Sequence, residues 1–225
     1  MLLSLSSVDP LSFKGNLAPI TDINNAEFHS GYQFLETDTE GLVVFNLTFS
    51  DSAGNDGVEV VSTTNSSWVV FDKTPPSDFN TGNTISIGGN QLSNVWNSTN
   101  TGADIFVPIV DNDTTIINGE IQIWGKVGTN PYEKVGDPFT ILESDAGTNK
   151  SLNIIETQVE SITGFLEGDS IYFKTVIVDK AGNEKEGSIS NNKLFIDQTL
   201  PSINYVSYKS DFTDTTLATV GHEII

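Results

Sequence analysis

The sequence contains no cysteine and no arginine, so all ten of its basic residues are lysine. Without thiols the chain has no disulfides, no thiol nucleophile and no cysteine-based zinc site. The 30 acidic residues leave a formal net charge of −20 at pH 7. Nucleic acids and anionic membranes bind proteins through clustered cationic side chains, so we expect neither as a partner of this acidic chain. The negative charge favours solubility and cation binding. The alternative is that the acidic side chains are only solvated at the surface and bind nothing.

The sequence also lacks long apolar runs, amphipathic helices and catalytic motifs. No stretch approaches the roughly 20 apolar residues that span a bilayer, so no membrane insertion is expected in this segment. Residues 1–5 are too short for a signal peptide. His29 and His222 lie in no ligand motif, and no nucleophile-elbow, phosphate-loop or zinc-protease motif occurs. The sequence therefore predicts a protein that is not an enzyme.

The sequence does contain an internal repeat. The pattern Asp-Xaa-Ala-Gly-Asn occurs at 51–55 and at 179–183, and Asp-Xaa-Thr-Xaa-Pro follows at 72–76 and at 197–201. Glycine and asparagine tolerate positive φ, and aspartate bonds nearby backbone N–H groups, so the first pattern predicts a chain reversal. Proline cannot donate to a β-ladder, so the second pattern ends a strand. A repeat of this kind indicates repeated domains.

Alternating apolar residues before each turn predict half-buried strands. Over residues 43–49 every second side chain is apolar, and residues 171–177 fall in the same register. Short alternating segments separated by turn residues predict an all-β sandwich. Residues 11–27 are expected to be rich in loops. Further strands are expected at residues 2–8, 28–35, 68–71, 85–87, 92–96, 105–110, 120–127, 139–142, 151–155, 159–165, 193–196 and 203–208.

Together the two patterns resemble the last two strands and the linker of bacterial tandem Ig-like domains, the modules of large secreted adhesins and surface proteins. Residues 38–75 match closely and residues 179–201 more loosely. The resemblance implies an all-β fold of tandem Ig-like antiparallel β-sandwiches at an extracellular or cell-surface location. It also implies a structural or adhesive function and carries no catalytic residues.

The repeat divides the chain into three parts. Residues 1–75 are expected to form an Ig-like domain that lacks its first strand or strands. Residues 76–201 are expected to form a complete Ig-like sandwich, and residues 202–225 to open a further domain. An incomplete sandwich exposes an unpaired edge, which a strand from a neighbour would close.

The tail therefore predicts a way of joining units. It would complete the 1–75 domain of a neighbouring copy, in a head-to-tail filament or in a longer tandem array. An arbitrary cut with frayed ends is the alternative. The expected partners are copies of the chain itself or adjacent Ig-like repeats. The candidates for the inter-subunit strand are Ile203, Tyr205, Val220, Ile224 and Ile225.

Calcium is the one cofactor that the sequence suggests, because a hard cation prefers oxygen ligands and acidic side chains stand at strand ends. The segment from Asp111 is not an EF-hand loop, since Ile116 and Gln122 occupy positions that need glycine and glutamate. The alternative is that Asp51 and Asp179 bond their own turns. The candidate ligands are Asp51, Asp72, Asp111, Asp113, Asp179 and Asp197.

A second functional hypothesis is a carbohydrate- or cell-surface-binding ectodomain. Trp68, Trp96 and Trp124 could form a sugar-stacking platform for a surface glycan, with core or interdomain packing as the competing interpretation. Asn-Xaa-Ser/Thr sequons would permit glycosylation, although such sequons also arise by chance in a chain rich in these residues. The sequons are at Asn46, Asn65, Asn97, Asn112 and Asn149.

Overall fold

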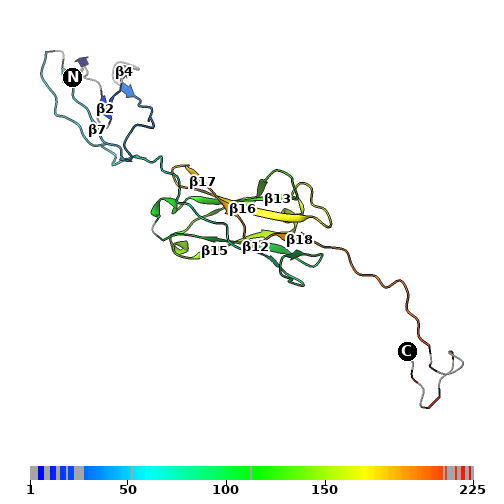
Figure 1. Cartoon of the computed structure of the whole chain (residues 1–225). Coiled ribbons are helices and arrows are strands. Elements are labelled where there is room, and N and C mark those ends of the chain that lie inside the picture. Colours follow the sequence, from blue (N-terminus) through cyan, green and yellow to red (C-terminus); the bar gives the residue numbers. More distant parts are fainter. Residues whose placement is uncertain are drawn as a thin grey trace.

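The computed structural model describes residues 5–7, 11–13, 16–18, 20–22, 28–51, 53–111, 113–209, 211, 216, 219–220 and 223. Nearly all of its regular structure is β, which confirms the predicted all-β class. A β-sandwich forms the middle of the chain. The described residues up to 75, here called the head, lie at one end of it, and an extended tail leaves from the other end (Figure 1). No helix among the described residues is long and apolar enough to cross a membrane.

The first sheet of the sandwich has the order β10-β12-β15 and is antiparallel. Strand β10 spans Thr84–Ile87, β12 spans Gly102–Pro108 and β15 spans Asn149–Ile155. In β12 alternate side chains point inward, and Ile105 and Val107 are fully buried. This sheet covers one side of the core.

The second sheet has the order β11-β18-β16-β13-β14, and β17 also pairs with β16. Strands β17 and β18 share one edge of β16, where β18 takes the beginning of that strand and β17 its end. Strand β11 runs parallel to β18, and every other pair of described strands in the sandwich is antiparallel. The strand bounds are β11 Val95–Trp96, β13 Glu120–Val127, β14 Glu133–Thr140, β16 Ser170–Val178, β17 Glu184–Ile189 and β18 Leu194–Ile196.

The two sheets enclose one hydrophobic core. In β16 the alternation is confirmed, because Ile171, Phe173, Thr175 and Ile177 are buried and the residues between them are partly exposed. The backbone N–H of Thr175 donates to the hydroxyl oxygen of Thr81 over 3.0 Å, and the two hydroxyls lie 2.9 Å apart. The one polar residue on the inward face of this strand is therefore hydrogen-bonded, as burial requires.

The strand predicted over residues 159–165 is wrong. Helix α1, Glu156–Glu160, follows β15, and turns lead from it to β16. Val159 in this helix and Ile162 in the turn after it are both buried in the core. Apolar residues three positions apart suit one face of a helical turn, so this short run did not distinguish helix from strand. Two 3₁₀ turns, Thr114–Ile116 and Glu143–Asp145, complete the helical structure of the described residues.

The described strands of the head are short and form three pairs and one three-stranded sheet. In residues 43–49 the predicted alternation is confirmed, because the residues of the apolar face are partly buried and Val44 is 55% exposed. The predicted continuous strand is nevertheless broken, and residues 11–27, expected to be rich in loops, include three strands of three residues each. The strands are β1 Leu5–Ser7, β2 Leu11–Phe13, β3 Asn16–Ala18, β4 Ile20–Asp22, β5 Phe28–Ser30, β6 Gly41–Leu42, β7 Phe45–Asn46, β8 Ser50–Asp51 and β9 Val70–Phe71.

These head strands pair as β1-β8, β3-β2-β7, β4-β5 and β6-β9. The ring of Phe34 stacks on that of Phe71 at 4.4 Å between centroids. This contact joins the segment after β5 to β9, the last strand of the head. Exposed apolar side chains remain around these pairs, including Val58 at 86% and Val61 at 62%. The described part of the head thus buries apolar surface less completely than the sandwich does.

The tail, here residues 201–209, is extended and belongs to no helix or strand of this chain. The strand predicted over residues 203–208 is not formed, because no strand among the described residues pairs with it. Ile203 and Tyr205 are each 82% exposed, and Val206 and Tyr208 are similarly open. Val220 lies in a turn and is exposed, and Ile224 and Ile225 lie outside the described residues.

Candidate functional site

The second Asp-Xaa-Ala-Gly-Asn pattern forms the turn between β16 and β17. The Asp179 side chain is buried there, and its Oδ1 accepts the backbone N–H groups of Ala181 and Asn183 over 2.8 and 2.9 Å. Its Oδ2 accepts the Asn183 side-chain amide over 2.9 Å. Gly182 closes the turn at φ +95°. Both oxygens of the buried carboxylate therefore stabilise the turn, which is the alternative that the sequence left open for Asp179.

The first copy of the pattern has the same glycine conformation, since Gly54 has φ +87°. Asp51 ends β8, and its side chain lies outside the described part of the chain. Further along, Asp72 Oδ1 accepts the backbone N–H of Thr74 over 3.0 Å, and its carbonyl accepts the Asn183 amide over 3.3 Å. The two repeats thus contact each other where the head meets the sandwich.

A glutamate holds each Asp-Xaa-Thr-Xaa-Pro segment in place. Glu40 Oε1 accepts the Lys73 N–H and the Thr74 hydroxyl, each over 2.8 Å. In the second repeat Glu167 Oε2 accepts the Gln198 N–H over 2.7 Å. Hydrogen bonds from Thr74 lower the pKa of Glu40, and those from Gln198, with Thr199, lower the pKa of Glu167. Sequence reasoning missed this shared contact, although Glu-Gly precedes the lead-in strand in both repeats.

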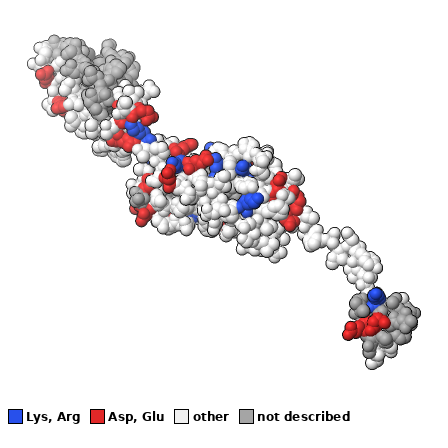
Figure 2. All heavy atoms as spheres, in the orientation of Figure 1, with Lys and Arg blue, Asp and Glu red and all other residues white. Residues whose placement is uncertain are grey.

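The space between head and sandwich is a cavity of about 730 Å³. The head contributes Trp68, Val70 and Asp72, and three loops of the sandwich supply the rest. Acidic and lysine side chains also gather where the head meets the sandwich (Figure 2). The other lining residues are Asp111, Asp113, Thr114, Thr115, Ile117, Asn118, Glu143, Ala146, Lys180 and Ala181.

Three of the predicted calcium ligands, Asp72, Asp111 and Asp113, line this cavity. Asp113 is already engaged: Oδ1 accepts the Thr115 N–H over 3.2 Å, and Oδ2 accepts the Ser77 N–H over 3.0 Å. Burial acts to raise the pKa of Asp113, but the hydrogen bonds from Thr115 and Ser77 outweigh it and lower that pKa. Asp197 lies at the opposite end of β16, where β18 leads into the tail.

The described residues contain no group of three or more acidic or histidine side chains placed to hold a metal. Calcium at the junction therefore stays a prediction. The candidate ligands are divided between the two ends of the sandwich, because β16 separates Asp179 from Asp197 along its length.

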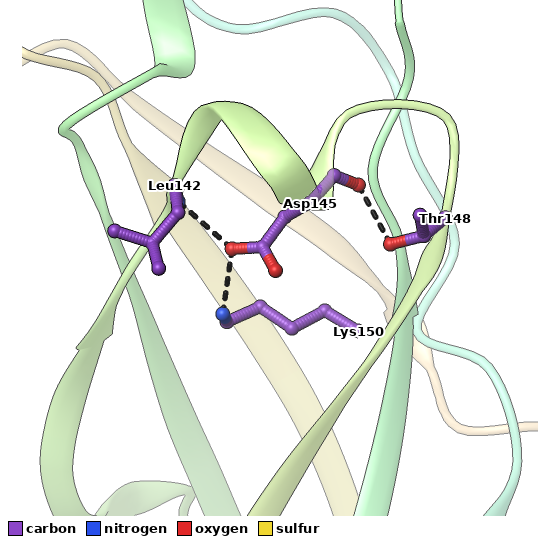
Figure 3. A network of polar contacts seen from close by, with 4 residues as sticks. All are labelled: Leu142, Asp145, Thr148 and Lys150. Atoms are coloured by element: carbon purple, nitrogen blue, oxygen red, sulfur yellow. Dashed lines mark hydrogen bonds and ion pairs between the residues drawn. The ribbon is translucent and has the colours of Figure 1, made fainter.

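A separate polar network rigidifies the loop beside this cavity (Figure 3). Asp145 Oδ2 accepts the Leu142 N–H over 2.8 Å and the Lys150 ammonium over 2.6 Å. The Thr148 hydroxyl donates to the Asp145 carbonyl over 2.7 Å. The side chains of Asp145 and Lys150 are each only 16% exposed. Burial acts to raise the pKa of Asp145, but Lys150 and Leu142 lower it overall.

The three tryptophans do not share a surface. Trp96 is fully buried in the core, and Trp68 is 70% exposed in the head. Trp124 is partly buried on the outer face of the second sheet, next to lysine and tyrosine side chains. The three tryptophans therefore form no common platform, and for Trp96 the competing interpretation, core packing, is confirmed, because it occupies an inward position of β11.

The sequons differ in their surroundings. Asn46, Asn65 and Asn149 are exposed. Asn97 is partly buried, and its amide donates to the Asn90 carbonyl over 2.7 Å while its oxygen accepts the Thr99 N–H over 3.0 Å. Asn97 thus holds its own loop together. Asn112 lies outside the described residues.

The outer face of the second sheet is a site that the sequence interpretation did not find. Trp124, Tyr132, Lys174, Val176, Glu184 and Glu186 line a pocket of about 340 Å³ there. The available signal was the alternation of aromatic and lysine residues at outward positions of β13 and β16. No family model matches this chain, and no curated protein matches it.

Proposed function

We propose that this protein is a structural or adhesive unit of an extracellular filament or stalk, built from Ig-like modules joined head to tail. The order of the strands supports the Ig-like assignment. A three-stranded sheet faces a sheet that includes two long central strands, β13 and β16, and in β12 and β16 buried residues alternate with partly exposed ones.

Shared local contacts support the tandem arrangement. Gly54 and Gly182 adopt the same positive φ in the two turns, and Glu40 and Glu167 hold the two strand ends in the same way. Two modules that end alike and follow one another along the chain are typical of stalk-forming proteins.

The observation that carries the joining mechanism is the exposed tail. Ile203 and Tyr205 are each 82% exposed in the tail, which leaves the sandwich at the end far from the head (Figure 1). An extended segment with apolar residues at alternate positions has the form of a donor strand. The head, with its short strand pairs and exposed valines, offers sheet edges to such a strand.

We place the protein outside the cell for two reasons. The exposed apolar tail suits the assembly of a surface structure, and the two repeated sequence patterns resemble those of secreted adhesins. Its partners are further copies of the chain or adjacent Ig-like repeats, and no reaction is assigned to it.

The test is the state of association of the purified chain by analytical ultracentrifugation and negative-stain microscopy. We expect regular head-to-tail assemblies, and their loss in the double variant Ile203→Asp with Tyr205→Asp. The matched control is Ser202→Asp with Asn204→Asp, which adds the same charge to the opposite side of the segment and should still assemble. Monodisperse rods of the parent chain at every concentration, or assembly that survives the first double variant, would overturn the proposal.

A further inference from the structure

The cavity between the head and the sandwich has an apolar wall that is open to solvent. Trp68 and Val70 line it from the head, and both side chains are exposed. Ile117, Ala146 and Ala181 line it from the sandwich. Apolar side chains that gather in one exposed hollow are typical of a surface that another segment covers. The volume of about 730 Å³ is large enough for several side chains of such a segment.

Strand β9, which carries the head side of this wall, has one open edge. Among the described strands it pairs with β6 alone. On the β6 side the Val43 N–H donates to the Val69 carbonyl over 2.8 Å. Successive residues of an antiparallel strand point their backbone groups in opposite directions. The N–H and carbonyl of Val70 therefore point away from β6, and this edge can accept one more strand.

The charges around the cavity favour a cation. Its described lining residues include four carboxylates and one ammonium, from Asp72, Asp111, Asp113 and Glu143 against Lys180. The first and third of these carboxylates already accept backbone N–H groups. The side chains of Asp111 and Glu143 form no hydrogen bond or ion pair with other described residues. They lie on neighbouring loops, since a Cβ added to Gly147 would be 3.4 Å from the Cβ of Asp111.

The tail has the complementary features. Residues 201–209 contain no carboxylate and one lysine, Lys209. Side chains two residues apart share a face of an extended strand, so Ile203, Tyr205 and Lys209 belong to one face. The lysine follows Tyr205 by four residues, which is about 13 Å of extended chain. The tail leaves the sandwich at the end opposite the head and points away from its own cavity (Figure 1).

We propose that this cavity receives the tail of a second copy, which adds as a strand to the open edge of β9. The apolar side chains of the tail cover Trp68 and Val70, and the Lys209 ammonium pairs with the carboxylates of Asp111 and Glu143. This inference rests on the head-to-tail joining proposed above and names its receiving site. One exposed ion pair contributes less than the repulsion between two chains of net charge −20, so it sets the direction and register of the joint rather than its strength.

The test uses nuclear magnetic resonance of the full chain with Ile203→Asp and Tyr205→Asp, whose own tail is disabled and whose cavity is unchanged. The probe is a synthetic peptide of residues 201–209, and the Trp68 indole signal is assigned by its loss in Trp68→Phe. We expect the peptide to shift this signal with a dissociation constant on the order of 0.1 mM. The Trp124 indole does not line the cavity, so its signal should stay in place.

A charge exchange tests the ion pair. A peptide with Lys209→Glu should bind about threefold more weakly, because the pair is exposed. Glu143→Lys in the receiving chain should restore the binding of this peptide. The matched control is Asp137→Lys, which changes the net charge equally at an exposed position of β14 outside the cavity and should restore nothing.

The outcomes separate this inference from the proposed function. Parent chains that stay single at every concentration overturn both. Parent chains that assemble, while the peptide leaves the Trp68 signal unchanged, overturn the receiving site alone. The receiving site is also overturned if a peptide of scrambled sequence shifts the Trp68 signal equally, because the cavity would then be a general apolar surface. Restoration by Asp137→Lys as well as by Glu143→Lys would exclude the ion pair.

Discussion

Single carboxylates in this protein act mainly on the backbone around them. Asp179 and Asp113 each accept two backbone N–H groups, and Asp145 accepts one together with a lysine ammonium. Charge-assisted bonds of this kind are stronger than neutral ones. In a chain of net charge −20, the stabilisation that these hydrogen bonds give to turns and loops offsets part of the destabilisation from repulsion between carboxylates.

Asp145 makes stability depend on pH in a defined direction. Its pKa is lowered in the folded chain, so its contribution is complete above the unfolded value of about 3.9 and is lost as pH falls below it. We expect Asp145→Asn to lower the free energy of unfolding by about 2 kcal/mol at pH 7. The difference from the parent should shrink below about pH 4.

Urea unfolding at a series of pH values measures this difference. The control is Asp137→Asn, which removes the same charge at an exposed position of β14 and should leave the unfolding free energy nearly unchanged. A difference between Asp145→Asn and the parent that is constant from neutral to acid pH would contradict the assignment.

Among the elements, the two glycine turns are the feature that the head and the sandwich most clearly share. Gly182 has φ +95°, and an added Cβ would meet nothing within 4 Å. We therefore expect Gly182→Ala to destabilise the sandwich by about 1–2 kcal/mol through backbone strain alone. Gly54→Ala, at φ +87°, should act in the same way on the head.

Thermal unfolding of the two variants tests this expectation. Gly31→Ala is the control, because an added Cβ there also meets nothing and the residue has no positive φ to oppose it. It should be neutral or slightly stabilising. A Gly182→Ala variant with the parent's melting temperature would show that the turn tolerates a side chain.

For the whole molecule, charge opposes association between copies. Raising the salt concentration from about 10 mM to about 1 M shortens the Debye length from about 30 Å to about 3 Å. The proposed apolar strand contact should therefore strengthen with salt, and sedimentation measurements at each concentration will show it. Weaker association at high salt would instead indicate complementary charges at the joint.

Calcium is tested in the same measurements. At equal ionic strength, calcium and magnesium should act alike if the cation only screens charge. A much stronger effect of calcium, reversed by chelator, would indicate a metal held at the junction.

The sequence alone determined the β class, the inward face of β16 and the two glycine turns, because each depends on residues close together in the chain. Period-two alternation needs no partner to be recognised, and positive φ is a local property of glycine. Only the tertiary structure decided that Asp179 is buried in its own turn, that Trp96 is in the core, and that Val159 and Ile162 belong to a helical segment. It alone brought Trp124, Tyr132 and Glu186 together, because Trp124 and Glu186 come from different strands, Tyr132 lies just before a third, and they meet only when the strands pair.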